Sequence, residues 1–205
     1  MTSRAPGELS GLRYVAIGDS YTVGTAVAPD EAFPHMLVRA VPALDLVANL
    51  GVNGYTTADL IRDELPALEA LDPEFVSLLI GVNDVVQGVP AATYEGNVVT
   101  ILDMLLERLP RGRIVTVAIP DYTVTPAGGD YGDPASQHDG IVANNAIMAR
   151  LATERGIAYV DTFDMSLRAA GDRSLVADDG LHPSAVQYAL WVERIAPVVA
   201  RLIGS

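Results

Sequence analysis

The sequence contains no cysteine and no lysine, and both absences bear on what the chain can do. Without cysteine the chain cannot form a disulfide, bind a metal through a thiolate or use a cysteine nucleophile. All 13 basic residues are arginines, against 26 acidic residues, so the formal net charge is −13. An acidic surface without a basic stripe argues against nucleic acid and anionic membranes as partners, and it favours a neutral or small substrate.

Long apolar runs are also absent. No stretch reaches the roughly 18 consecutive apolar residues that a membrane-spanning helix needs, and residues 1–12 lack the apolar core of a signal peptide. We therefore expect no integral membrane association and a cytoplasmic location, with secretion after removal of a signal as the alternative. Half of the 205 residues are hydrophobic, so residues 1–205 are predicted to form a single domain with a sizeable core.

Apolar runs and helical patterns alternate along the chain. The runs that predict strands lie at residues 14–17, 44–50, 75–80, 114–119 and 157–160. Amphipathic segments at helical spacing lie between them, which predicts an α/β protein with a five-stranded parallel sheet covered by helices on both faces. We expect residues 120–138 to form a long loop and Pro197 to kink or split the last helix.

The first predicted strand runs into a tight turn that carries a serine. The sequence Gly18-Asp19-Ser20 follows an apolar run, and Gly24 closes the turn. Ligands of open parallel sheets sit at the carboxyl ends of the strands, close to the positive end of the following helix. Ser20 is therefore a candidate nucleophile, and a serine that only caps the helix is the alternative.

A serine nucleophile needs a base, and the chain has only three histidines. His35 is expected on the solvent-facing side of a helix, and His138 is expected to be exposed at the border of the long loop. His182 lies in a turn, three residues after Asp179, so that carboxylate can fold back to hold one ring nitrogen while the other faces a hydroxyl. A surface histidine–aspartate pair without catalytic use is the alternative.

Four sequence blocks together resemble the SGNH, or GDSL, hydrolases. They occur in the family order: Gly18-Asp19-Ser20 with Gly24, Asn49–Gly54 with Thr56, Gly81 with Asn83-Asp84, and Asp179-Gly180-Leu181-His182-Pro183. The resemblance implies a three-layer, flavodoxin-like α/β/α sandwich and hydrolysis of esters or thioesters with no metal or other cofactor. It implies Ser20 as the nucleophile, His182 as the base and Asp179 as the partner of that base.

The same resemblance implies an oxyanion hole made by the backbone N–H groups of Ser20 and Gly54 and the side-chain amide of Asn83. Three further residues are candidate substrate contacts: Tyr21, Asn53 and Tyr122. Asn53 stands where many members have serine, and neither Tyr21 nor the 120–126 segment belongs to a general family block. Asp19 and Asp84 are expected to be turn and network residues. The 120–138 loop is expected to set acyl or alcohol preference, with a solvated excursion as the alternative.

The sequence thus predicts a serine hydrolase that cleaves small-molecule acyl esters through an acyl-enzyme intermediate, like a carboxylesterase, a lysophospholipase or an acetylesterase. An acyltransferase with the same triad is the nearest alternative. A flavodoxin-like binding module, in which Ser20, Tyr21 and Thr22 cradle a phosphate, is a further alternative. That module would leave Asn83 and the Asp179–His182 pair without a role.

Overall fold

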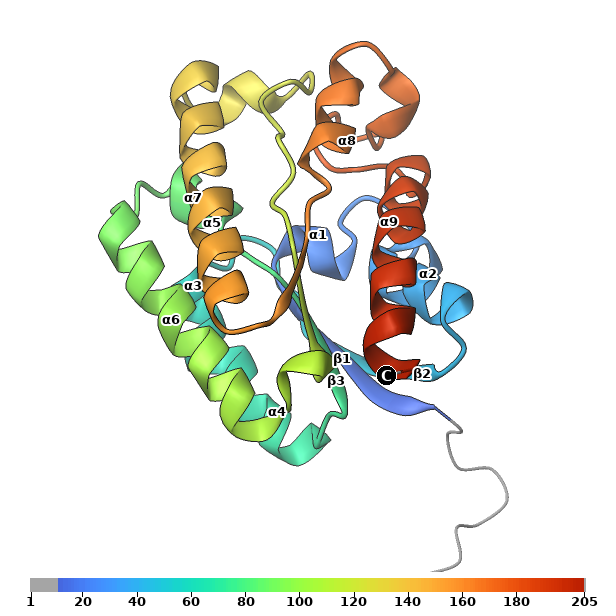
Figure 1. Cartoon of the computed structure of the whole chain (residues 1–205). Helices are drawn as coiled ribbons and strands as arrows, with labels where there is room; N and C mark the ends of the chain where they lie inside the picture. The colour runs from blue at the N-terminus through green and yellow to red at the C-terminus, as the bar shows by residue number, and fades with distance from the viewer. Residues whose placement is uncertain (1–10, 205) are drawn as a thin grey trace, which may run out of the picture.

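The computed structural model describes residues 11–204, which form a five-stranded sheet with the strand order β2-β1-β3-β4-β5 (Figure 1). All four strand pairs are parallel, as predicted. The strands are β1 (Leu12–Gly18), β2 (Leu44–Asn49), β3 (Phe75–Leu79), β4 (Ile114–Val117) and β5 (Ala158–Val160). This is the flavodoxin-like strand order, in which the chain changes direction across the sheet between β1 and β3.

Helices follow every strand. They are α1 (Ser20–Val23), α2 (Phe33–Ala40), α3 (Thr57–Asp59), α4 (Leu65–Leu71), α5 (Val82–Val86), α6 (Ala91–Arg108), α7 (Pro134–Glu154), α8 (Phe163–Leu167) and α9 (Ala185–Gly204). Residues 11–204 also form six short helical turns: η1 (Pro29–Glu31), η2 (Leu60–Glu64), η3 (Arg111–Arg113), η4 (Gly128–Tyr131), η5 (Arg168–Ala170) and η6 (Arg173–Leu175). Among residues 11–204 no helix is both long and apolar enough to cross a membrane.

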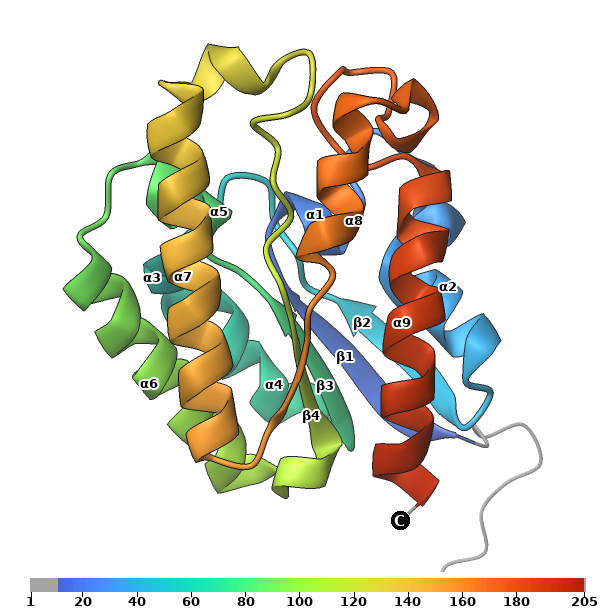
Figure 2. The ribbon, with the colours of Figure 1, turned by 45° about the horizontal axis from the view of Figure 1, so that its top comes forward.

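The sheet separates two apolar cores, because successive side chains of a strand point to opposite faces. Tyr14 and Ala16 of β1 contribute to the core that contains α2 and α9. Val15 and Ile17 contribute to the core that contains α4 and α6. Figure 2 shows these helix layers on either side of the sheet. The arrangement confirms the predicted three-layer α/β/α fold.

Three local expectations need correction. The long loop is shorter than predicted, because α7 begins at Pro134, where Asp133 accepts a hydrogen bond from the backbone N–H of Ser136 at 2.9 Å and proline suits the first helical turn. His138 consequently lies in α7. The last helix is not split at Pro197, since Ile195 and Val199 are both fully buried and hold the segments on either side of it against the core.

His35 is the third correction, because it is half-buried in α2 instead of facing solvent. Its Nδ1 atom is buried and lacks a hydrogen-bond partner among the described residues. Partial burial lowers the pKa of His35, and the nearby Arg39 lowers it further. His35 lies outside the pocket described below.

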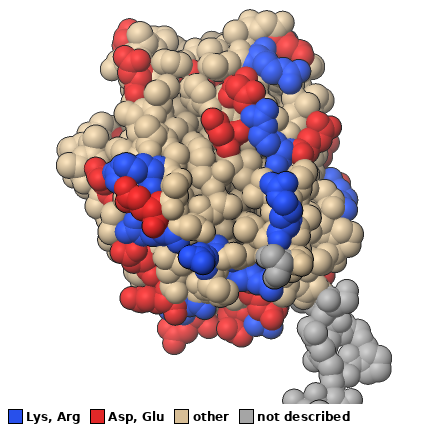
Figure 3. Space-filling view, viewed as in Figure 1, with Lys and Arg blue, Asp and Glu red and all other residues tan. Residues whose placement is uncertain are grey.

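Arginines and acidic residues lie side by side on the surface seen in Figure 3. Arg150 pairs with Glu95 at 2.6 Å, and Arg155 pairs with Asp103 at 2.7 Å. Arg194 similarly pairs with Asp164. Exposed pairs of this kind contribute little to stability, but they leave the charge of these arginines locally neutralised.

Candidate active site

The turn after β1 places Ser20 at the switch point of the sheet. Asp19 caps α1 by accepting a hydrogen bond from the backbone N–H of Tyr21 at 3.0 Å. Gly18 adopts φ +148°, and a Cβ at this position would lie 2.0 Å from the carbonyl oxygen of Leu79. Only glycine therefore allows β1 to lie this close to β3 and still enter the turn.

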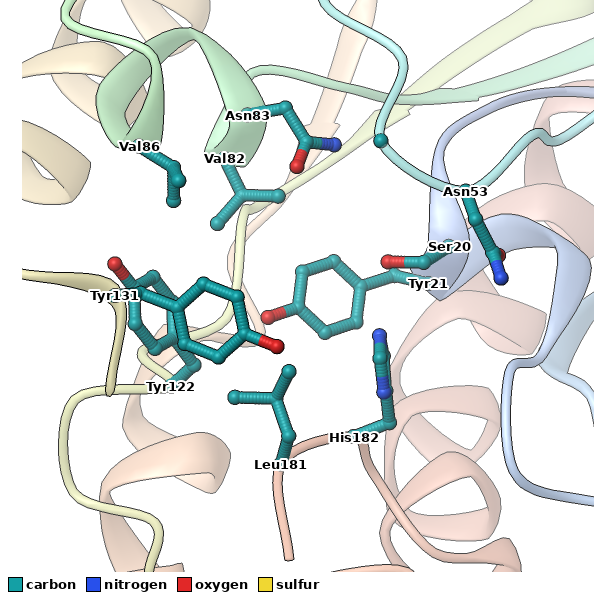
Figure 4. A pocket seen from close by; sticks show the side chains of 11 residues that line it. Ser20, Tyr21, Asn53, Val82, Asn83, Val86, Tyr122, Tyr131, Leu181 and His182 are labelled. Carbon is teal, nitrogen blue, oxygen red and sulfur yellow. The ribbon is translucent and has the colours of Figure 1, made fainter. Parts of the chain in front are cut away.

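Ser20 and His182 face the same cavity, as Figure 4 shows. Ser20 is 8% exposed and begins α1, whereas His182 comes from the segment before α9. The hydrogen bonds of the described residues include none between the Ser20 hydroxyl and the His182 ring. Such contacts are often long in a free enzyme and tighten when substrate binds.

Asp179 holds His182 from within the same turn. Its Oδ2 atom lies 2.6 Å from Nδ1 of His182, and its Oδ1 accepts the backbone N–H groups of Leu181 at 2.9 Å and His182 at 3.0 Å. Burial favours the neutral acid, but these hydrogen bonds, with the His182 ring first among them, outweigh it and lower the pKa of Asp179. The carboxylate is thus an acceptor for Nδ1–H, which leaves Nε2 on the cavity side.

The segments that follow β2 and β3 bring Gly54 and Asn83 to this cavity. Gly54 has φ +81°, and Asn83 lies in the first turn of α5. One N–H of the Asn83 amide donates to the carbonyl of Tyr55 at 2.9 Å, which holds the side chain in place and leaves its second N–H free of that bond. Gln87, one helical turn further along, donates to the carbonyl of Gly54 at 3.1 Å.

Asp84 supports the loop between β2 and α3, which carries Gly54, and does not line the cavity. Its Oδ2 accepts the backbone N–H of Thr57 at 2.9 Å, and its Oδ1 accepts the Thr57 hydroxyl at 2.5 Å. Asn97 of α6 also donates to the Thr57 hydroxyl, at 2.9 Å. These bonds fasten the start of α3, and hence the loop that carries Gly54, to α5 and α6.

The cavity has a volume of about 310 Å³ and extends from Ser20 to the segment after β4. It is lined by Ser20, Tyr21, Asn53, Gly54, Val82, Asn83, Val86, Tyr122, Tyr131, Leu181 and His182. The three candidate substrate contacts therefore all reach it. Asn53 is held by the hydroxyl of Thr25 at 2.5 Å, and Tyr131 is 44% exposed at the rim.

Two hydrogen bonds tie the segment after β4 to α7. Asp121, whose side chain is fully buried, lies 2.6 Å from Nδ1 of His138, and Tyr122 donates its hydroxyl to Gln137 at 2.7 Å. Tyr122 also packs edge-on against Tyr131 at 5.8 Å between ring centroids. His138 thus serves as an anchor for the cavity wall and does not line the cavity.

Two further acidic residues, Asp19 and Glu64, lie buried behind the turn that carries Ser20. Glu64 accepts the backbone N–H of Gly18 at 2.8 Å. It ends η2, a π turn in which the N–H of Leu65 bonds to the carbonyl of Leu60. One oxygen of each carboxyl is buried without a partner among the described residues. Burial raises the pKa of both groups to about 8, so each is mostly neutral at pH 7.

These raised pKa values predict how stability depends on pH. Between about pH 4.5 and 8 the folded chain keeps protons on Asp19 and Glu64 that the unfolded chain releases, because their ordinary pKa values are 3.8 and 4.5. These groups therefore make stability fall as pH rises through that window. Glu64→Gln keeps an acceptor for Gly18 and removes one titration. We expect the unfolding midpoint of Glu64→Gln to fall less between pH 5 and pH 8 than the unfolding midpoint of the parent.

Glu69→Gln is the control for this measurement, since Glu69 is exposed on α4. Urea or thermal unfolding of the three chains across the pH range provides the comparison. If Glu64→Gln loses as much stability as the parent between pH 5 and 8, the neutral state of Glu64 is wrong.

The described residues contain no group of three or more histidines and acids arranged to hold a metal ion. Fold and cavity together define an α/β/α protein with a serine, a carboxylate-held histidine and an asparagine amide at the switch point of its sheet.

The sequence model of the GDSL-like lipase/acylhydrolase family matches residues 16–190. The chain belongs to this family, which places it among hydrolases that act on esters. In a comparison with proteins of curated function, no significant match is found.

Solved structures share the fold at low sequence identity. A member of the lipolytic G-D-S-L family from Veillonella parvula superimposes with a TM-score of 0.76 at 16% identity, covering 92% of this chain and 98% of that one. The psychrotrophic esterase EstA from a Pseudoalteromonas species gives 0.71 at 16% identity, with 94% and 99% covered. An acetylxylan esterase from Geobacillus stearothermophilus gives 0.70 at 22% identity, with 96% and 95% covered.

Proposed function

We propose that this chain is a serine ester hydrolase that works through an acyl-enzyme intermediate formed on Ser20. The observation that carries the proposal is the shared cavity of Ser20, the Asp179-held His182 and the Asn83 amide. Serine attack on a carbonyl requires a nucleophile, an oriented base and donors for the developing oxyanion. Each of these requirements has a candidate among the residues that line the cavity.

In the proposed reaction the Ser20 hydroxyl attacks the acyl carbon while Nε2 of His182 removes its proton. The negative charge that develops on the carbonyl oxygen is stabilised by the backbone N–H groups of Ser20 and Gly54 and by the free N–H of Asn83. His182 then passes the proton to the departing alcohol oxygen as the ester bond breaks. Water, deprotonated by the same nitrogen, attacks the acyl-enzyme and releases the acid.

The position of Ser20 at the start of α1 supports this assignment. The first N–H groups of a helix lack intrahelical partners and carry partial positive charge, which favours an oxyanion next to them. Asp19 already uses the N–H of Tyr21, so the N–H of Ser20 is the donor that remains at the nucleophile. Asp179 supplies the acceptor that keeps the proton of neutral His182 on Nδ1 and its lone pair on Nε2.

The test is hydrolysis of nitrophenyl esters of increasing acyl length, with acyl thioesters and acetylated sugars alongside, by the parent and Asn83→Ala. Removal of one oxyanion donor costs about 10²–10³ in kcat. We expect that loss with a KM within a few-fold of the parent, because the donor acts on charge that develops in the transition state. A raised KM with unchanged kcat would make Asn83 a binding residue and contradict the oxyanion hole.

A further inference from the structure

The hydroxyl of Tyr21 has no partner in the part of the chain that the structure describes, although the residue is only 3% exposed. Figure 4 shows the Tyr21 ring between Ser20 and the segment after β4, with its hydroxyl directed into the cavity. The hydroxyl thus faces the part of the cavity that lies away from Ser20. Because this hydroxyl is open to the cavity, it is free to bond to solvent or to a bound ligand there.

Two other buried tyrosines of this region bond their hydroxyls within the protein, whereas the buried Tyr94 hydroxyl beside Gly81 has no partner among the described residues. Tyr122 donates to Gln137 at 2.7 Å, and Tyr188 donates to the carbonyl of Tyr21 at 3.0 Å. Val82, Val86 and Leu181, which lie around the Tyr21 ring in the cavity, are apolar. Figure 4 also shows the Tyr131 hydroxyl near that of Tyr21, but the two hydroxyls form no hydrogen bond. No described residue therefore accepts a hydrogen bond from the Tyr21 hydroxyl.

The position of that hydroxyl relative to Ser20 is rigid. The two residues are consecutive in α1, and the backbone N–H and carbonyl of Tyr21 are bonded to Asp19 and Tyr188. Its ring packs edge-on against His182 at 5.7 Å and Trp191 at 6.4 Å between centroids. Burial raises the pKa of Tyr21 well above its ordinary value, so the group is a neutral O–H donor.

We propose that the Tyr21 hydroxyl is a specificity determinant that donates a hydrogen bond to an oxygen of the bound ester, beyond the reacting carbonyl. The preferred substrates are esters that carry an ether, carbonyl or hydroxyl oxygen at the position that the Tyr21 hydroxyl reaches. Esters with a plain hydrocarbon chain at that position are disfavoured. This inference rests on the proposed function, because the oxygen is placed relative to an ester held at Ser20. A fixed donor left without an acceptor disfavours the hydrocarbon analogue, since its lost hydrogen bond to water is not replaced.

The test compares alkanoyl nitrophenyl esters with matched esters in which an ether oxygen replaces one methylene at successive positions. A second series places the same replacement in the alcohol half, as alkoxyalkyl against alkyl acetates followed by acid release. At one position of one series we expect the parent to prefer the ether ester by about tenfold in kcat/KM. The series in which the preference occurs identifies the half of the ester that reaches Tyr21.

Tyr21→Phe removes only the hydroxyl. In this variant the ratio of kcat/KM between the ether ester and its hydrocarbon analogue should fall close to one. Tyr159→Phe is the matched comparison, because Tyr159 lies in β5 and does not line the cavity, and it should keep the preference of the parent. A parent without preference in either series would overturn the inference, and so would a Tyr21→Phe variant that keeps it. Absence of hydrolysis of every ester by the parent would instead overturn the proposed function.

Discussion

Ser20→Ala is expected to abolish ester hydrolysis while leaving the fold intact. Loss of the nucleophile in a serine hydrolase lowers kcat by about 10⁶. Alanine suits the first turn of α1, and the cap of that helix is the Asp19 carboxyl, not the Ser20 hydroxyl. The unfolding midpoint should therefore stay close to that of the parent. The rate is measured with the best nitrophenyl ester of the panel.

Ser136→Ala is the control for this variant, because Ser136 lies exposed in the first turn of α7 and away from the cavity. Its rate should match that of the parent. If Ser20→Ala keeps more than a small fraction of the parent rate in protein free of contaminating esterase, Ser20 is not the nucleophile.

Asp179→Asn is expected to lower kcat by about 10³–10⁴, because an amide does not hold the histidine in the tautomer that the reaction needs. Its oxygen can still accept the backbone N–H groups of Leu181 and His182, so the turn should keep its shape. The variant thus separates orientation of the base from folding of the loop.

The adjacent Asp178 gives a matched control for that experiment. It is exposed, and it makes no hydrogen bond or ion pair among residues 11–204. Asp178→Asn should therefore retain nearly full activity. Equal, small losses in both variants would mean that another group orients His182.

The fold was predictable because its central strands β1, β3 and β4 are buried on both faces. Val76 and Leu78 of β3 point to one core, and Phe75 and Leu79 point to the other. A strand buried in this way appears as a continuous apolar run, and the polar residue that ends it marks the edge of the sheet. Ser20 was identified in this manner and Asn83 from the family resemblance, and the structure brings both to one cavity.

Contacts across long stretches of sequence were not predictable in the same way. The bond from Gly18 to Glu64 joins residues that are 46 positions apart, and Glu64 is the last residue of the π turn η2. A periodic pattern does not reveal which side chain such a turn directs inward. Asp121 could have been identified as a polar residue soon after a buried strand. Its partner His138, however, lies in the first turns of α7, at residues that were predicted as loop.

Gln87 carried another signal that sequence reasoning missed. It lies four residues after Asn83 and thus on the same side of the helix as the amide. The structure shows that both side chains hold the loop at Gly54 and Tyr55. An amide that follows another at this spacing, after a strand, is the pattern that would have found it.

The most direct test of the central claim is the site at which a fluorophosphonate probe reacts. A serine hydroxyl that a base activates attacks the phosphorus of such a probe, forms a stable O–P bond and expels fluoride. Peptide mass analysis of the labelled parent should find the added mass on Ser20, and Ser20→Ala should take up no label. Labelling of another serine, or none at a probe concentration that fully labels a known serine esterase, would contradict the account.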